Sequence, residues 1–491
     1  MRHLLFALVV AQVLAGACAL ARNLGKVPHY GDTRAGVAGT LSPAAAPGYV
    51  RLAHDGSADS RRGLLYPVFL RLVHDAGGGP WFEGLDLEDR QRMPKHAIDC
   101  WAPAWQMRAQ LLQLAVFAAA LVFAGAVFTR RRLTSRWPPL LLALVYVDPV
   151  LVHAQLSLLP DGLSLSACLL FLAGFVEYTR DGKKCGLLLL LLGATLAAGL
   201  RPEKGLVLGS ACALTMAGLA LWRTRPPRSR FRALLATAGV FVAAAAFAGA
   251  GRWLERGSEH WTVAETVVHA RIVYPRLEAI HAALPEDAQR RIPLDLARRY
   301  DTSIQEGRQV VHQATEGDAA VRRALTAELR RVALRERWLA IGIDCSIDSL
   351  RNLAATPEFL VRLATWAWHD REVAGRSADR RWESVGSWLM LSYHEPDWSL
   401  VSLVGAIAVL LVGWVLGAER VLHATRSGAW RRAPWAAVLP VAAFLAVNAA
   451  AFGFTQDLFD LRYVYPSHLA WVALGCAGAV ASLQPRSPAS S

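Results

Sequence analysis

Long apolar stretches alternate with shorter polar connections along the chain, and this alternation predicts the secondary structure. Each stretch approaches the roughly 20 residues that an α-helix needs to cross a hydrocarbon core about 30 Å thick. The apolar stretches run approximately over 3–22, 110–128, 137–157, 162–178, 185–200, 205–222, 232–253, 399–417, 434–453 and 463–483. The pattern therefore predicts an all-α fold, a polytopic integral membrane protein with about ten transmembrane helices and two extracytoplasmic segments.

Clusters of basic residues separate these helices in a regular order. They follow the second, fourth, sixth and eighth stretches, whereas the other short connections hold almost no basic residues. The clusters are Arg130, Arg131, Arg132 and Arg136; Arg180, Lys183 and Lys184; Arg223, Arg225, Arg228, Arg230 and Arg232; and Arg420, Arg426, Arg431 and Arg432. Because cytoplasmic loops are enriched in Lys and Arg, we expect a multi-pass protein of the cell membrane with both termini in the cytoplasm.

This orientation places two long polar segments on the outer side of the membrane. The expected organisation is a first transmembrane helix at 1–22, an extracytoplasmic loop with an amphipathic interfacial helix at 23–109, transmembrane helices 2–7 at 110–253, an extracytoplasmic helical domain at 254–398, transmembrane helices 8–10 at 399–483 and a cytoplasmic tail at 484–491. In the outer domain, Val321–Leu339 carries one apolar stripe, and prolines divide the domain into short helices. The first stretch could also be a signal peptide, but its length favours an uncleaved helix.

Composition and charge support the same class of protein. The chain has 491 residues, of which 54% are hydrophobic and only 19% charged, too little charge for a soluble surface of this size. The net charge of +14 lies largely in the basic clusters, so it indicates topology and not nucleic-acid binding. Of seven cysteines, only Cys100 and Cys345 lie in polar segments, and the sequence leaves their pairing open.

Ionisable and polar side chains gather at the predicted outer ends of the helices. Such groups near membrane depth are costly and are therefore functional candidates. The candidates are Asp32, Arg61, Arg62, Tyr66, Asp148, His153, Asp161, Arg201, Glu203, Asp460, Arg462 and Tyr463. Arg61, Arg62 and Tyr66 belong to a segment with a basic head and an apolar tail, as in a helix lying in the membrane interface.

Each candidate also has a structural interpretation. Asp148 and Asp161, both next to proline, could cap helices, and Arg201 with Glu203 or Arg462 with Asp460 could form ion pairs. These alternatives stay open at the level of sequence. The sequence contains no cluster with metal-ligand spacing, since two residues in a loop, His29 and Asp32, do not make a site. Whether the protein uses a cofactor, such as a divalent metal, stays unknown.

Four features together resemble the GT-C superfamily of membrane glycosyltransferases. They are an Asp shortly after the first helix (Asp32), a Tyr-Pro segment in the first outer loop (Tyr66), an Arg-Pro-Glu outer turn (201–203) and Asp-x-x-Asp-Leu-Arg-Tyr-x-x-Pro before a late helix (457–466). The resemblance implies an enzyme like the aminoarabinose and protein O-mannosyl transferases. Such an enzyme would bind membrane lipid and take a sugar from a polyprenyl-phosphate donor that lies in the bilayer. It would act at the outer face of the membrane. The second acid that often follows in this family is absent, because Thr33 and Arg34 follow Asp32.

The chemistry of such a transfer assigns roles to these residues. Asp32 would act as the base that accepts the proton of the acceptor hydroxyl, and Arg201 and Arg462 would hold the donor phosphate through two-pronged hydrogen bonds. The other candidates except Asp148 would bind substrate, namely Arg61, Arg62, Tyr66, His153, Asp161, Glu203, Asp460 and Tyr463. Two alternatives remain: a transporter or flippase of a lipid-linked or anionic solute, and an enzyme that polymerises or ligates lipid-linked glycans.

Overall fold

The structure is a computed structural model of the 491-residue chain. It describes residues 2–24, 49–56, 63–79, 81, 104–128, 137–156, 159–181, 183–221, 237–247, 249–250, 282, 286–291, 339, 343, 346–347, 349–350, 405–406, 408–416, 418–419, 422, 435–455 and 465–472.

Every regular element in these residues is helical, and they contain no β-strand. The helices are α1 (Arg2–Asn23), α3 (Tyr49–Asp55), α4 (Leu65–Asp75), α6 (Ala104–Phe128), α7 (Trp137–Tyr146), α8 (Pro149–Leu156), α9 (Asp161–Asp181), α10 (Lys184–Leu200), α11 (Pro202–Leu221), α15 (Glu286–Arg291) and α23 (Trp435–Thr455). Further helical segments lie at 237–247, 408–416 and 465–472. The predicted all-α class is therefore confirmed for the described part of the chain.

Two of the described helices are long and apolar enough to cross a membrane, namely Ala104–Val127 and Asp161–Thr179. Shorter apolar helices lie at Phe6–Ala21, Lys184–Leu200, Lys204–Ala217, Thr237–Phe247 and Val441–Ala451. A helix thus occurs within each of the ten apolar stretches of the sequence. Membrane passage by about ten helices stays a prediction.

The third predicted stretch, 137–157, is not one continuous helix. It is broken at Val147 and Asp148 into α7 and α8. Pro149 has no N–H to donate to the preceding turn, which disfavours a continuous helix. The Asp148 carboxylate instead accepts hydrogen bonds from the backbone N–H groups of Val150 and Leu151, each at 3.1 Å, and so caps α8. The structural interpretation of Asp148 as a helix cap is confirmed.

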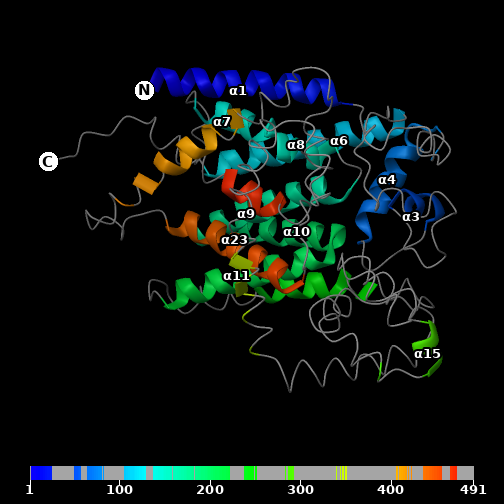
Figure 1. Ribbon diagram of the computed structural model, residues 1–491. Coiled ribbons are helices and arrows are strands. Elements are labelled where there is room, and N and C mark those ends of the chain that lie inside the picture. The colour runs from blue at the N-terminus through cyan, green and yellow to red at the C-terminus, as the bar shows by residue number, and fades with distance from the viewer. Residues whose placement is uncertain are drawn as a thin grey trace.

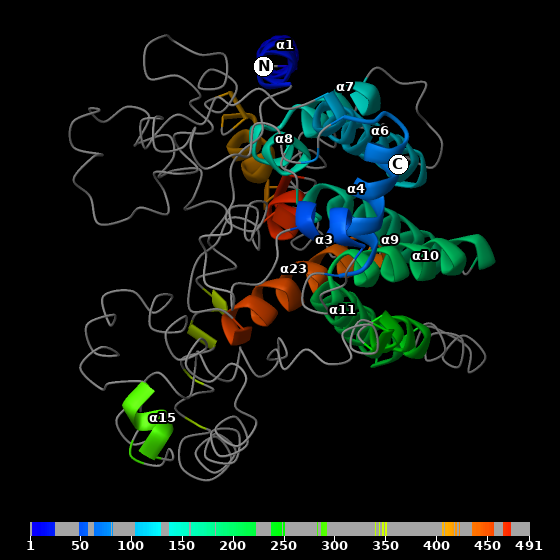
Figure 2. The ribbon, with the colours of Figure 1, turned by 90° about the vertical axis from the view of Figure 1, so that its right-hand side faces the viewer.

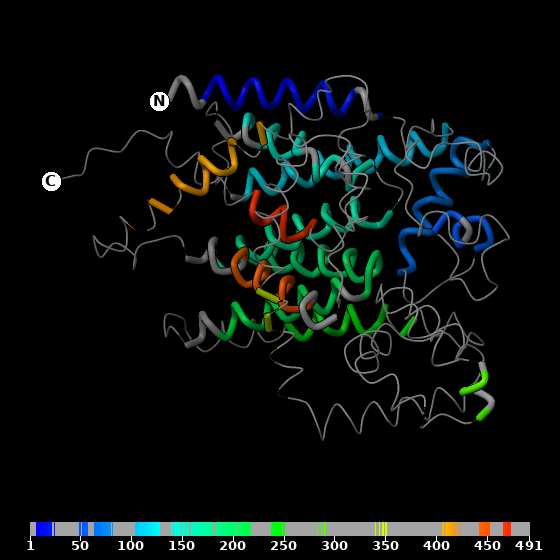
Figure 3. The backbone as a smooth tube through the Cα atoms, in the orientation of Figure 1, coloured from blue at the N-terminus to red at the C-terminus, as the bar shows by residue number. Residues whose placement is uncertain are grey.

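The long helices form one bundle (Figure 1, Figure 3). Helix α9 lies at its centre and contacts α6, α8, α10, α11 and α23, while α1 packs on α7 and α8 at one edge. The segment 465–472, red in Figure 1, lies between α8 and α23, and Figure 2 shows the same order from a perpendicular direction. Helices α3 and α4 lie at one end of the bundle, where α4 contacts α6 and α10.

Helices α9 and α10 pack through glycine with their backbones close together. A Cβ atom on Gly193 would lie 2.8 Å from the carbonyl oxygen of Ala167 and would also collide with the backbone N of Phe171. Gly174 and Gly186 meet at the other end of the same contact. Small residues that allow such close approach are typical of helix pairs in membranes.

The bundle interior is mainly apolar but also holds buried polar side chains, and many large apolar side chains lie on the outside. Leu188 and Val242 are each 68% exposed, and many other leucines and valines of α6, α10 and α11 also point outward. The interior holds Gln106, Gln110, Gln113, Asp148, Gln155, Asp161, Arg201, Lys204, Asn448 and His468, all buried. Lysine and aspartate are almost never fully buried in soluble proteins unless they are paired.

The two predicted outer segments are described only in part. Within 23–109 the structure contains α3, α4 and the start of α6, which begins at Ala104 and not at 110. Within 254–398 it contains α15, which lies between Pro285 and Pro293 as the prolines predict. The apolar stripe expected over Val321–Leu339 lies outside the described residues except at Leu339.

Candidate functional site

A buried ion pair lies where α9 and α11 begin and α10 ends. Arg201 Nη2 donates a hydrogen bond to Asp161 Oδ2 at 3.0 Å, and the two side chains are 7% and 3% exposed. The sequence suggested Glu203 as the structural partner of Arg201, but the described partner is Asp161, 40 residues earlier. Lys204 is also fully buried nearby on the first turn of α11, so two cations and one carboxylate belong to this region.

The connection between α10 and α11 fixes the position of Arg201. Arg201 alone separates the two helices, with φ −148° and ψ 107°, and its backbone N–H still donates to Ala197 O at 2.8 Å. Its own carbonyl accepts from Lys204 N at 3.0 Å, and Pro202 occupies the first position of α11, where a missing N–H costs nothing. The predicted outer turn is therefore a single residue, and its guanidinium points into the bundle and not into solvent.

Helix α4 covers this end of the bundle and brings Tyr66 to the site. Gly63, just before α4, has φ +75°, and a Cβ atom there would collide with the carbonyl oxygen of Leu200. Only glycine fits this contact between the start of α4 and the end of α10. Burial raises the pKa of Tyr66 well above its ordinary value, and the nearby groups Tyr49 and Asp161 raise it further. The Tyr66 hydroxyl therefore stays protonated near the Asp161 carboxylate.

Buried glutamines connect Tyr66 to the turn before Asp161. The Tyr66 hydroxyl donates to Gln113 Oε1 at 3.0 Å, and Gln113 Nε2 donates to the carbonyl of Gln155 at 2.6 Å. Gln110 Nε2 donates to Leu156 O at 2.8 Å, and Gln155 Nε2 donates to Gly162 O at 3.2 Å. Gln110 and Gln113 thereby satisfy carbonyl groups that the last turn of α8 would otherwise leave unpaired, and Gln155 joins α8 to the first turn of α9.

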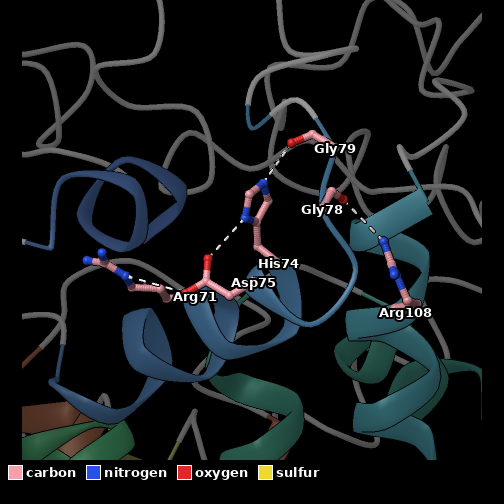
Figure 4. Close-up of polar contacts among 6 residues, drawn as sticks. All are labelled: Arg71, His74, Asp75, Gly78, Gly79 and Arg108. Carbon is pink, nitrogen blue, oxygen red and sulfur yellow. Dashed lines mark hydrogen bonds and ion pairs between the residues drawn. The ribbon is translucent and has the colours of Figure 1, made fainter.

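Polar contacts beyond Tyr66 fix the far end of α4 against α6 (Figure 4). His74 Nε2 donates to Gly79 O at 2.8 Å, and Arg108 Nη2 of α6 donates to Gly78 O at 3.3 Å. The φ angles of Gly78 and Gly79 are +62° and +115°, which favour glycine. The ring of His74 also stacks on Trp81 with centroids 3.7 Å apart. This loop holds α4, and with it Tyr66, over the bundle end.

A second buried pair lies deeper in the bundle. His468 Nε2 donates to Asp148 Oδ1 at 3.0 Å, and the two side chains are 0% and 4% exposed. The neighbouring Ser467 Oγ accepts a hydrogen bond from Asn448 Nδ2 at 2.7 Å, which joins the segment 465–472 to α23. Asp148 thus both caps α8 and connects it to the last described helix.

The structure brings together three of the residues selected from the sequence, Tyr66, Asp161 and Arg201. His153 lies within α8 and Glu203 on the first turn of α11, but their side chains are not among those described. Asp32, Arg61, Arg62, Asp460, Arg462 and Tyr463 lie outside the described residues, so the positions of the expected base and of the second expected arginine stay predictions. The described residues contain no group of three His, Cys, Asp or Glu that could hold a metal ion.

Sequence reasoning missed several buried polar residues. His468 lies inside the apolar stretch 463–483, and the rule that marks an ionisable group within a span as functional would have selected it. Gln113 and Gln155 carry no comparable signal, because an uncharged amide in an apolar helix is neither rare nor diagnostic. Comparisons with models of protein families, with curated proteins and with solved structures find no match for this chain.

Proposed function

We propose that the chain is a polytopic membrane protein whose bundle axis crosses the bilayer. The distribution of side chains supports this, since exposed leucine and valine on α6, α10 and α11 suit a lipid surface and the polar groups face the interior. The glycine contacts between α9 and α10 agree, because helix association in lipid depends on close packing. The end that carries α3 and α4 is then the outer face, and α4 lies outside the spans.

We propose that this protein is a glycosyltransferase that uses a polyprenyl-phosphate sugar donor and acts at that outer face. One observation carries the proposal: Arg201 and Asp161 are paired and buried, with the buried Lys204 on the adjoining turn, at the end of the bundle where α4 packs on α6 and α10. A buried arginine and lysine are costly in such a place and suit a ligand with a phosphate headgroup and a lipid tail. The resemblance to the GT-C superfamily supports the same substrate class.

The arrangement suggests how the donor would be held. Arg201 uses one terminal nitrogen for Asp161, which orients the guanidinium plane, and the same fork suits a phosphate oxygen. Helices α9 and α11 both begin at this point, so their N-terminal partial positive charges add to those of the two cations. Positive charge in this position stabilises the negative charge that grows on the departing phosphate. The acceptor could be a glycan, a lipid or a protein.

The test measures sugar transfer by purified protein from a panel of short-chain polyprenyl-phosphate sugars, with membrane glycolipid extract as acceptor. We expect Arg201→Lys to reduce transfer at least about tenfold, because an ammonium keeps the charge and loses the two-pronged contact. The exposed Arg290→Lys makes the same substitution away from the site and should leave transfer unchanged. Mass spectrometry of surface glycans from cells with and without the gene identifies sugar and acceptor. No transfer with any donor contradicts the proposal.

A transporter or flippase is the second candidate, and the break between α7 and α8 favours it. Broken helices with buried ionisable groups near the break are typical of substrate or ion sites in transporters. Asp148 and His468 form such a pair at this break. Binding of the polyprenyl-phosphate donor without any release of sugar by the parent protein would favour this candidate over the enzyme.

A further inference from the structure

The proposed phosphate site is closed to both solvent and lipid. The Arg201 and Asp161 side chains are 7% and 3% exposed, and the adjoining Lys204 is 1% exposed. A phosphate group that binds Arg201 needs direct contact with the guanidinium nitrogens. The exposed fraction is too small for that contact to be made from outside, so an element at this end of the bundle has to move before a donor headgroup can bind.

The start of α4 lies against the end of α10, beside this site (Figure 1). A Cβ atom on Gly199 would lie 2.7 Å from Leu65 Cγ, and a Cβ atom on Gly63 would collide with the carbonyl oxygen of Leu200. Because Arg201 directly follows Leu200, the first turn of α4 lies next to the residue that would hold the phosphate. Moving α9, α10 or α11 would disrupt the ion pair itself, whereas moving α4 would only uncover it.

Helix α4 is held from one side only. Val68 and Leu72 on its outward face are 52% and 65% exposed, so nothing packs over the helix to prevent an outward movement. The chain enters α4 after Gly63 and leaves it before Gly78, with φ angles of +75° and +62°. Hinge rotations are typically absorbed by a few residues at the ends of an element, and both ends of α4 offer such positions.

A hydrogen bond joins the buried face of α4 to the bundle. The Tyr66 hydroxyl donates to Gln113 Oε1 at 3.0 Å, and both side chains are fully buried. Leu70 and Val73 on the same face belong to an apolar cluster and contribute no polar contact. At the far end, the bond from Arg108 to the carbonyl of Gly78 is exposed, so water can replace it. The hydrogen bond between Tyr66 and Gln113 is therefore the polar contact that an outward movement of α4 would break.

We propose that α4 is a lid over the Arg201 site, that the hydrogen bond between Tyr66 and Gln113 is its latch, and that opening of the lid admits the donor phosphate. The inference rests on the proposed binding of a polyprenyl phosphate at Arg201. Opening exposes the guanidinium, and closure over the bound phosphate removes water and strengthens the charge-assisted hydrogen bonds. Because only the open protein can bind, the affinity and the association rate both scale with the fraction of open protein.

The first test locks the lid closed with a disulfide between positions 65 and 199. Since Leu65 Cγ lies 2.7 Å from a Cβ atom on Gly199, Leu65→Cys and Gly199→Cys together bring two Cβ atoms close enough for the bond. The measurement is the affinity of the purified protein for a short-chain polyprenyl phosphate without sugar. We expect the oxidised double variant to lose at least about 20-fold in affinity and to recover on reduction. Each single variant, treated with the same oxidant, is the control and should keep its affinity.

The second test releases the latch. Gln113→Leu removes the acceptor of the Tyr66 hydroxyl, which is then unpaired in the closed state and hydrated in the open state, so the open fraction should rise. Gln110→Leu is the matched control, because Gln110 is equally buried on α6 and donates to Leu156 O, and in the described residues it makes no hydrogen bond to α4. We expect polyprenyl phosphate to associate about fivefold faster with Gln113→Leu than with the control. A purely structural role of Gln113 would not accelerate association.

The outcomes separate the lid from the proposed transfer. An oxidised double variant within about twofold of its reduced form, or equal association rates for the two glutamine variants, overturns the lid and leaves the transfer intact. If the disulfide does not form, the two glutamine variants decide. Phosphate binding that depends on the lid, without any sugar transfer by the parent protein, supports the lid and contradicts the glycosyltransferase. A parent protein that binds no polyprenyl phosphate contradicts both.

Discussion

At the scale of single residues, the buried pair of Asp161 and Arg201 dominates the energetics of the site. Removing two charges from water is costly, and their mutual attraction offsets this only while both are present. Breaking such a pair typically costs about 3–5 kcal/mol, because the remaining charge is left in an apolar surrounding. An exposed pair such as Glu286 and Arg290 contributes less than about 1 kcal/mol.

Asp161→Asn should therefore lower the free energy of unfolding by about 3 kcal/mol or more. Arg201 would then face a neutral amide in place of the Asp161 carboxylate. Denaturant unfolding in detergent micelles measures the loss, with Glu286→Gln as the matched control. If both variants lose the same small amount, the Asp161 region is hydrated, and its description as a buried pair is wrong.

Tyr66 should make the free energy of unfolding decrease as the pH rises into the alkaline range. Its pKa is raised in the folded state, first by burial and then by Tyr49 and Asp161, while in the unfolded chain it has the ordinary tyrosine value. Above that ordinary value the unfolded state releases a proton that the folded state retains. Stability is therefore fully present below pH 10 or so and decreases as the pH rises toward the raised pKa.

Tyr66→Phe should remove this contribution. We expect a loss of about 1 kcal/mol at neutral pH, because the hydrogen bond to Gln113 is lost. Between about pH 9.5 and 11 the variant should lose less stability than the parent, since one fewer group releases its proton on unfolding. Unfolding curves across this range provide the measurement, and equal slopes in the two proteins would exclude Tyr66 as the group responsible.

At the scale of elements, the close packing of α9 on α10 determines whether the site can form. Asp161 begins α9 and Arg201 follows α10, so any separation of the two helices moves the partners of the ion pair. Gly174, Gly186 and Gly193 face backbone atoms of the neighbouring helix, which cannot move aside as a flexible side chain would. Their substitution should therefore affect both stability and the ion pair.

We expect Gly193→Ala to cost about 1–3 kcal/mol, because its methyl group would overlap the backbone of Ala167 and Phe171. Gly249→Ala is the matched control, since a Cβ atom there meets nothing within 4 Å and alanine favours helix. Thermal unfolding in micelles compares the two variants with the parent. A stabilised Gly193→Ala variant would show that α9 and α10 are further apart than described.

The sequence predicted where most elements lie, but not how they are interrupted or paired. Hydropathy located the helices because a long apolar run is seldom compatible with another secondary structure. It placed the start of α6 six residues late, because Gln106 is polar and yet faces the interior. The break at Asp148-Pro149 follows from helix capping by these two residues. Hydropathy averaged over a window of many residues does not detect it. Arg201 and Asp161 were both selected as candidates, but their pairing depends on the α9–α10 contact, which has no local signature.

At the scale of the whole molecule, the direction of the helices agrees with the basic clusters. The starts of α6, α9 and α11 lie at the bundle end that carries α4, as the contacts of Gln113 with Tyr66 and of Asp161 with Arg201 show. Each of these helices runs away from that end, and in the sequence a basic cluster follows or includes its last turn, beginning at Arg130, Arg180 and Arg223 respectively.

This common direction leads to a test of the membrane orientation. Because arginine clusters are retained on the cytoplasmic side, a reporter fused after Arg132, Arg232 or Arg432 should be active in the cytoplasm. A reporter fused near Gly317, within the long polar segment 254–398, should be active outside, on the same face as Tyr66, Asp161 and Arg201. Each position is fused in turn to two reporters, one active only in the cytoplasm and one active only outside. The two reporters should give opposite results at the same position, which serves as the control. Cytoplasmic activity near Gly317 would place the site on the inner face, where it could not use a donor presented in the outer leaflet.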